Sequence, residues 1–136
     1  MVENNIVRDS IVNGITLGGS LNGTIYVTNN TIVGGLGGIV VGGSSEAYSP
    51  STFITNNIVV DCEGTGIRIG PYQTAIVDSN DIWGCNDDYA LAELPVPTEL
   101  RNALSVNPLF VSEDPVDIDD FRLALNSTLV EAGTCD

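Results

Sequence analysis

The sequence contains no histidine and no lysine. Without histidine, the chain cannot build a Ser-His-Asp or Cys-His nucleophilic site from its own residues, and it cannot bind zinc through imidazole. Without lysine, it cannot form a Schiff base with a carbonyl substrate. The side chains that remain for chemistry are therefore those of Asp, Glu, Arg, Tyr and Cys.

Positive charge is also scarce, because 4 arginines face 18 acidic residues and the formal net charge is −14. Nucleic acids and anionic membranes are bound by cationic surfaces, so we expect neither as a partner. No apolar run approaches the roughly 18 residues of a membrane helix, and residues 1–5 do not read as a signal peptide. We therefore expect no membrane insertion.

Two motifs alternate along the first part of the chain. The first reads glycine, isoleucine, any residue, an aliphatic residue and glycine, at residues 14–18, 38–42 and 66–70. The second is an asparagine followed two residues later by valine or isoleucine, at Asn5, Asn30, Asn57 and Asn80. These asparagines are 25, 27 and 23 residues apart. Such a repeat predicts a solenoid, in which a repeat buries its apolar face only against its neighbours.

Each repeat is long enough for a coil of three short parallel strands. We expect the first strand at the Gly-Ile motif, the second before each asparagine and the third directly after it. Because side chains alternate between the two faces of a strand, the motif aliphatics should point inward and stack in rows. The predicted rows are Ile15, Ile39 and Ile67; Leu17, Val41 and Ile69; Val27, Ile54 and Val77; Val7, Ile32, Val59 and Ile82. The sequence therefore predicts an all-β parallel solenoid of three to four coils.

The repeated asparagines are predicted to form a structural ladder. The bend between the second and third strands needs a left-handed residue, and Asn tolerates that conformation better than other non-glycine residues. The amide group carries a donor and an acceptor. Stacked Asn5, Asn30, Asn57 and Asn80 should therefore hydrogen-bond from coil to coil.

The repeat resembles that of the parallel β-helices of the pectate-lyase-like superfamily. Residues 107–111, 120–123 and 126–134 resemble the closing segment of many secreted members. The resemblance implies a right-handed, single-stranded parallel β-helix and an extracellular or cell-surface location. It does not identify a function, because the superfamily includes lyases, hydrolases, epimerases and inert adhesins.

We expect residues 1–136 to form one β-helix domain with three parts. Residues 1–83 carry the regular coils. The period breaks after Ile82, and the prolines downstream would stop a short helix, so residues 84–106 are predicted to be a loop with a short helical excursion. Residues 107–136 are predicted to hold closing strands and a tail that cap the solenoid.

The first coil has no predicted cap. Residues 1–5 are too few to cover the apolar side chains of Val7, Ile15 and Leu17. Open strand edges favour pairing with another chain. The sequence thus predicts a homo-oligomer formed through the N-terminal coil, or upstream coils in a longer chain.

Two of the three cysteines occupy equivalent places in the repeat. Cys62 and Cys85 each lie five residues after a ladder asparagine. Stacked in neighbouring coils, they would be close enough for a disulfide, or they would form a reduced pair in the interior. Cys135 is left over, and three scattered cysteines do not make a metal motif.

In enzymes of the resembled superfamily, the substrate groove follows the sheet of Gly-Ile strands. Mapped onto this chain, the groove would be lined by Thr16, Val40, Arg68, Tyr48 and Tyr72. Asp9, Asp61 and Glu63 would stand on the loops leading into it, as candidate calcium ligands.

The resemblance allows two catalytic readings. In a calcium-assisted uronate lyase, Asp61 and Glu63 would hold the cation and Arg68 would act as the Brønsted base. A glycoside hydrolase would instead use two of the carboxylates of Asp9, Asp61 and Glu63. The structural alternative is that Arg68 pairs with Asp61 or Glu63.

Two further features allow both a functional and a structural interpretation. The acidic run at residues 113–120 is either a second cation site or a solvated loop. Trp83 follows an inward residue and should face outward, where it could stack on a sugar ring or pack against the chain.

Two functions remain open. The first is a non-catalytic β-helix module that self-associates, or that binds carbohydrate or a surface partner. It is favoured by the small number of coils and by Arg68 as the single basic residue on the groove face. The alternative is a polysaccharide lyase or glycoside hydrolase, or the C-terminal fragment of one, with calcium as the one candidate cofactor.

Overall fold

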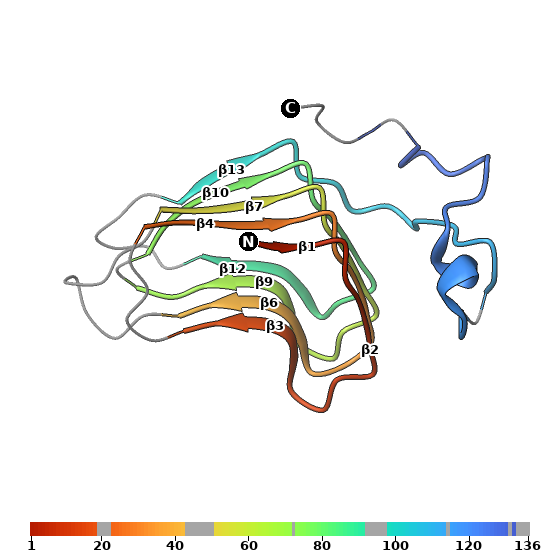
Figure 1. Ribbon diagram of the computed structural model, residues 1–136, viewed down its shortest axis with the longest axis horizontal. Coiled ribbons are helices and arrows are strands. Elements are labelled where there is room, and N and C mark those ends of the chain that lie inside the picture. Colours follow the sequence, from red (N-terminus) through yellow and green to blue (C-terminus); the bar gives the residue numbers. More distant parts are fainter. Residues whose placement is uncertain are drawn as a thin grey trace.

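The computed structural model describes residues 1–18, 23–42, 51–71, 73–91, 98–113, 115–130 and 132. The backbone winds through successive coils, whose short strands stack into three sheets (Figure 1). The strand pairs described in these sheets are all parallel. The predicted parallel β-helix is confirmed.

Each sheet collects equivalent strands of successive coils. The Gly-Ile sheet consists of β3 (Asn13–Leu17), β6 (Gly37–Val41), β9 (Thr65–Ile69) and β12 (Asp87–Leu91). The five-stranded sheet consists of β1 (Val2–Glu3), β4 (Thr24–Thr28), β7 (Ser51–Thr55), β10 (Thr74–Asp78) and β13 (Glu99–Arg101). The short-strand sheet consists of β2 (Ile6–Arg8), β5 (Thr31–Val33), β8 (Ile58–Val60) and β11 (Asp81–Trp83).

Rows of aliphatic side chains fill the interior of the coils. In the Gly-Ile sheet, Ile39 is in register with Ile15 on one side and Ile67 on the other. The other sheets carry equivalent rows. The largest fully buried aliphatic side chains are Ile32, Ile39, Ile54, Ile67, Ile69, Ile82, Val27, Val41, Val59 and Val77. These are residues of the predicted rows. Each coil buries its row against the next coil, so stability depends on stacking.

The asparagines form a directional ladder. The Oδ1 atoms of Asn30, Asn57 and Asn80 each accept two hydrogen bonds of 2.8–3.1 Å from the asparagine one coil earlier, one from its backbone N–H and one from its Nδ2. Nδ2 of Asn57 also donates to the carbonyls of Thr55 and Val27. Asn30 and Asn80 repeat this arrangement with their own neighbours. A buried amide is thereby satisfied at each step.

The left-handed residue at this bend differs from the expectation. Positive φ angles belong to the residues just before the ladder positions: Asn4, Asn29, Asn56, Ser79 and Asn102. The ladder asparagines themselves have no positive φ. The preceding residue turns the backbone, and the turn leaves the ladder amide free to point inward.

Residues 84–106 were expected to form a loop and a short helix, and the described part of this segment continues the solenoid instead. Asp87–Leu91 is β12, in register with β9, and Glu99–Arg101 is β13, in register with β10. Tyr89 takes the inward place of Ile67, which explains why the motif is hard to see. Backbone pairing with the preceding coil overrides the helical preference of Ala and Leu here.

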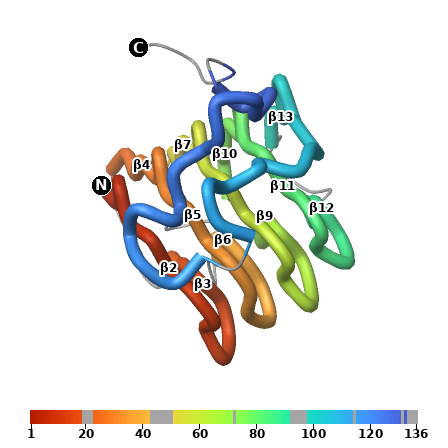
Figure 2. The backbone as a smooth tube through the Cα atoms, turned by 90° about the vertical axis from the view of Figure 1, so that its right-hand side faces the viewer, coloured from red at the N-terminus to blue at the C-terminus, as the bar shows by residue number. Residues whose placement is uncertain are grey.

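The sequence predicts that residues 107–136 cap the coils with closing strands and a tail. In the described part of 107–130 we find only an antiparallel bridge between Phe110 and Leu123 and a short 3-10 helix, η1 (Ile118–Phe121). We call residues 105–113 and 115–123 the strap. It runs along the outside of the short-strand sheet toward the first coil (Figure 2). There the guanidinium of Arg8 donates to the Pro115 carbonyl.

The ladder gives a direct prediction. Asn57→Ala should lower the free energy of unfolding by about 3 kcal/mol or more, because it leaves buried backbone carbonyls and Asn30 donors without partners. Asn5→Ala is the matched control at the open end, where the side chain is exposed and the loss should be clearly smaller. Urea unfolding of the two variants tests this. Equal losses of unfolding free energy in the two variants would contradict a stabilising role of the buried ladder.

Candidate functional site

Three of the predicted groove residues lie in one outward row on the Gly-Ile sheet. Thr16, Val40, Arg68 and Ala90 are successive neighbours across β3, β6, β9 and β12. Arg68 is exposed beside a shallow hollow lined by Ile69, Gly70, Pro71, Ala90 and Leu91. No acidic residue is among the residues that line this hollow. The other two predicted groove residues, Tyr48 and Tyr72, lie outside the described residues.

Asp9 and Asp61 occupy the corner that follows the short-strand sheet. They have positive φ angles of 51° and 55°, and Gly34 and Gly84 fill the same corner in the alternate coils with 74° and 71°. A Cβ atom at Gly84 would collide with the Asp61 carboxylate, and one at Gly34 would come within 2.9 Å of Asp9 Oδ1. Each aspartate therefore packs against a glycine of the next coil. This contact is a structural explanation for the two aspartates at the corner.

The residues proposed for catalysis line three different hollows. Asp9 and Glu63 line one hollow, Asp61 lines a second and Arg68 lines a third. Among the described residues, Arg68 has no carboxylate within ion-pair distance, so its expected pairing with Asp61 or Glu63 is absent. Asp9 instead pairs with Arg8, at 2.9 Å between Oδ2 and Nε.

No group of three or more Asp, Glu or Cys side chains that could hold a metal ion occurs in the described parts of the chain. Asp9, Asp61 and Glu63 do not converge there. Calcium binding stays a prediction.

The cysteines left two possibilities open, and in the structure Cys62 and Cys85 are joined in a disulfide. Their Cα atoms are 4.5 Å apart, in neighbouring coils at the corner after β8 and β11. The bond ties two coils together across 23 residues of sequence, and it lies beside Asp61 and Gly84. Cys135 lies outside the described residues.

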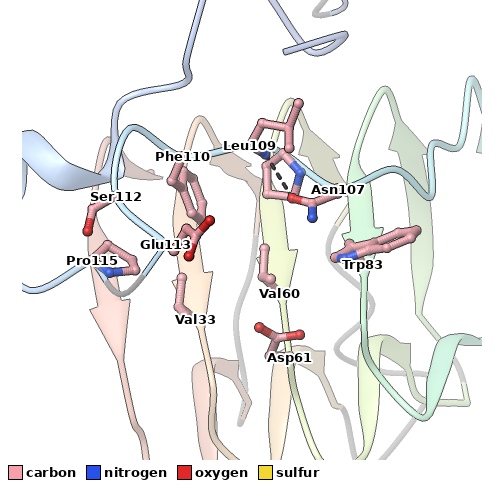
Figure 3. Close-up of a pocket in the computed structure, with 11 residues that line it drawn as sticks. Val33, Val60, Asp61, Trp83, Asn107, Leu109, Phe110, Ser112, Glu113 and Pro115 are labelled. Atoms are coloured by element: carbon pink, nitrogen blue, oxygen red, sulfur yellow. Dashed lines mark hydrogen bonds between the residues drawn. The ribbon is translucent and has the colours of Figure 1, made fainter. Parts of the chain in front are cut away.

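A cleft of about 320 Å³ lies between the short-strand sheet and the strap (Figure 3). The sheet side contributes Val33, Val60, Asp61 and Trp83. The strap side contributes Asn107, Pro108, Leu109, Phe110, Ser112, Glu113 and Pro115. We call this space the strap cleft.

The polar groups of the strap cleft surround an apolar floor. In Figure 3 the Glu113 and Asp61 carboxylates lie on either side of the Val33 and Val60 side chains, and Trp83 lies beside Val60. Trp83 faces outward as predicted and is 38% exposed. Sequence reasoning missed this site because the strap was read as closing strands. The available clue was the row of apolar outward residues on the short-strand sheet, Val33, Val60 and Trp83.

Asp81 is the most perturbed carboxyl group near the strap. It is 2% exposed, Oδ1 accepts the Val106 N–H at 2.9 Å, and Oδ2 has no hydrogen-bond partner among the described residues. Burial raises the pKa of Asp81 to about 6, against the Val106 hydrogen bond and with a smaller contribution from Asp88. Burial likewise raises the pKa of Tyr89 to about 12, helped by Asp88 and Asp81.

The acidic run forms local structure around η1. The Asp120 carboxylate accepts the backbone N–H groups of Val116 and Asp117, which lowers the pKa of Asp120. Asp117 is the N-terminal cap residue of η1. The described part of this run therefore reads as a capped, exposed turn.

The family described as "Right handed beta helix region" matches residues 1–107, which is 107 of the 136 residues. The chain therefore belongs to the right-handed β-helix family, consistent with the pectate-lyase-like resemblance. Searches of curated proteins and of solved structures give no match. Within the described residues, no helix has the length and apolar character needed to cross a membrane.

Asp81 predicts a pH dependence of stability. Its folded pKa of about 6 lies above the ordinary value of 3.8, so the folded protein binds this proton more tightly than the unfolded chain does. The resulting stabilisation is complete at a pH below the ordinary pKa of 3.8 and is lost as the pH rises through about 6. The free energy of unfolding should fall by roughly 3 kcal/mol over this range. Unfolding measured across this range should show the loss.

The variant Asp81→Asn should be more stable than the unchanged protein above this pH and should lack the dependence, since the amide carries no charge. Its carbonyl oxygen can still accept the Val106 N–H. Asp87→Asn, which removes an exposed carboxylate from the neighbouring β12, is the control. If Asp81→Asn and Asp87→Asn follow the same pH curve, the assignment to Asp81 is wrong.

Proposed function

We propose that the protein is a non-catalytic β-helix module that self-associates end to end, with the first coil of one copy stacked on the last coil of another. The observation that carries this proposal is the polarity of the asparagine ladder. Each Oδ1 accepts from the coil before it, and each backbone N–H donates to the coil after it.

The two ends of the ladder are complementary. Among the described residues, no donor reaches Asn5 Oδ1 at the first coil. At the last coil Leu104 N–H donates to the Asn80 carbonyl, as Ile58 N–H does to Asn30, so Ala103 stands at the ladder position. Its N–H has no acceptor within the described part of the chain. A second copy stacked in register would bring this donor to the open acceptor.

Within the described residues, the first coil also leaves apolar surface and strand edges uncovered. β1, β2 and β3 are terminal strands of their sheets, each with a neighbour on one side. Val2, Val7 and Leu17 of this coil pack against the core but are only partly buried. An open edge of this kind is a template for strand addition, and burying it would stabilise an assembly.

The separation of Arg68 from Asp61 and Glu63 supports the non-catalytic part of the proposal. A lyase would need the cation ligands and the base around one sugar, and their hollows are different. Binding of carbohydrate or a surface partner remains compatible with a self-associating module and stays a prediction.

Sedimentation over a range of protein concentrations tests the assembly. We expect species heavier than one chain whose proportion rises with concentration. Leu17→Lys should shift the population to the monomer, because it places a charge at the open end of the core, where a stacked coil would have to bury it. Thr16→Lys is the matched control, with the same charge on the outward side of the same strand.

Circular dichroism should show that both variants keep their β-structure. A protein that stays monomeric at every concentration would overturn the proposal. So would equal effects of Leu17→Lys and Thr16→Lys, because the open end would then have no special part in association.

A further inference from the structure

The strap cleft combines negative charge with aromatic and aliphatic surface. Asp61 and Glu113 are exposed carboxylates, and Trp83 and Phe110 supply two rings. Val33, Val60 and the strap prolines supply the aliphatic part. None of the eleven residues that line it carries a positive charge. We propose that the strap cleft binds an organic cation, namely an alkylguanidinium group.

The charge of the chain favours a cation as the ligand of the strap cleft. The chain carries a net charge of −14, so a cation is drawn toward it, and two carboxylates around one cleft concentrate that field. The arginines described near the strap are already engaged: Arg8 pairs with Asp9 and donates to the Pro115 carbonyl, and Arg122 pairs with Asp119. A ligand would therefore supply the counter-charge for Asp61 and Glu113.

The apolar floor decides which cation fits. A metal ion would have to exchange its water for two carboxylates above valine side chains, a poor replacement for a full shell of oxygen ligands. An ammonium group is compact and strongly hydrated. A guanidinium group is planar and more weakly hydrated, donates in a fork that matches a carboxylate, and stacks on aromatic rings. It suits Trp83 together with Asp61 and Glu113.

The size of the strap cleft agrees with this ligand. Its volume of about 320 Å³ is at the lower end of the range for small-molecule sites. An alkylguanidinium would lie over Val33 and Val60, with the Asp61 and Glu113 carboxylates on either side of its charged group. The amide of Asn107 and the hydroxyl of Ser112 line the same space and can supply further hydrogen bonds.

The chain has a built-in reporter for this site, because Trp83 is its only tryptophan. We would titrate n-butylguanidinium while recording tryptophan fluorescence, and repeat the titration by calorimetry. The neutral control is n-butylurea, which has nearly the same planar shape and the same stem. We expect saturable binding of the cation, weakened by added salt, and about tenfold weaker binding of the urea or none. Equal binding of the two probes would overturn the proposal.

Variants assign the binding to the two carboxylates. Asp61→Asn and Glu113→Gln should each weaken n-butylguanidinium binding by about tenfold. Asparagine tolerates the left-handed backbone of residue 61, so the corner should be kept. Glu63→Gln is the matched control, since it removes one charge two residues from Asp61 but lines a different hollow, and it should leave binding unchanged.

Unchanged binding in both Asp61→Asn and Glu113→Gln, with the fold intact by circular dichroism, would also overturn the proposal. A peptide with one arginine between capped glycines distinguishes two sources of the same group. Binding about tenfold tighter than that of n-butylguanidinium would support an arginine side chain of a partner protein. Equal or weaker binding would support a free small molecule. This test does not depend on self-association, which Leu17→Lys probes in a different sheet, at the open edge of β3.

Discussion

The hydrogen bonds between stacked asparagines are the interaction on which the rest of this structure depends. A coil this narrow must turn sharply between β-strands, and each turn brings polar backbone into the interior. The side chains of Asn30, Asn57 and Asn80 are almost wholly buried, and each accepts from one coil while donating to carbonyls of its own coil and the one before. This satisfies the buried polar groups and fixes the register of all three sheets at once.

The ladder fixes the bend between the five-stranded and short-strand sheets, and the other corners of the coils can vary in sequence. The candidate functional side chains lie at or near these other corners. The corner after the short-strand sheet alternates aspartate with glycine, and the Cys62–Cys85 disulfide ties two coils beside it. The strap crosses the outer face of the same sheet and buries Asp81. The strap cleft therefore combines residues from the repeat, such as Asp61, with residues from outside it, such as Glu113.

The sequence repeat made the coils predictable. The features that were missed, β12 and the strap cleft, lie where this repeat is weak or absent. The Gly-Ile and asparagine motifs located β3, β6 and β9 and the buried rows, because the same residue types recur at the same place in each coil. β12 was missed because Tyr89 replaces the inward isoleucine within a helix-favouring stretch. The strap side of the cleft could not be predicted, because residue spacing carries no information on where a non-repeating segment folds back. The family resemblance grouped Arg68 with Asp61 and Glu63, and in the structure these residues line different hollows.

Hydrogen exchange of the asparagine side chains, followed by NMR, tests most directly whether the ladder holds the fold. The account predicts that the Nδ2 protons of Asn30, Asn57 and Asn80 exchange as slowly as the slowest backbone amides of the sheets, and that those of Asn5 exchange much faster. Fast exchange of all four side chains in a protein whose sheet amides remain protected would contradict it. The coils would then be held by strand pairing and aliphatic stacking without the ladder.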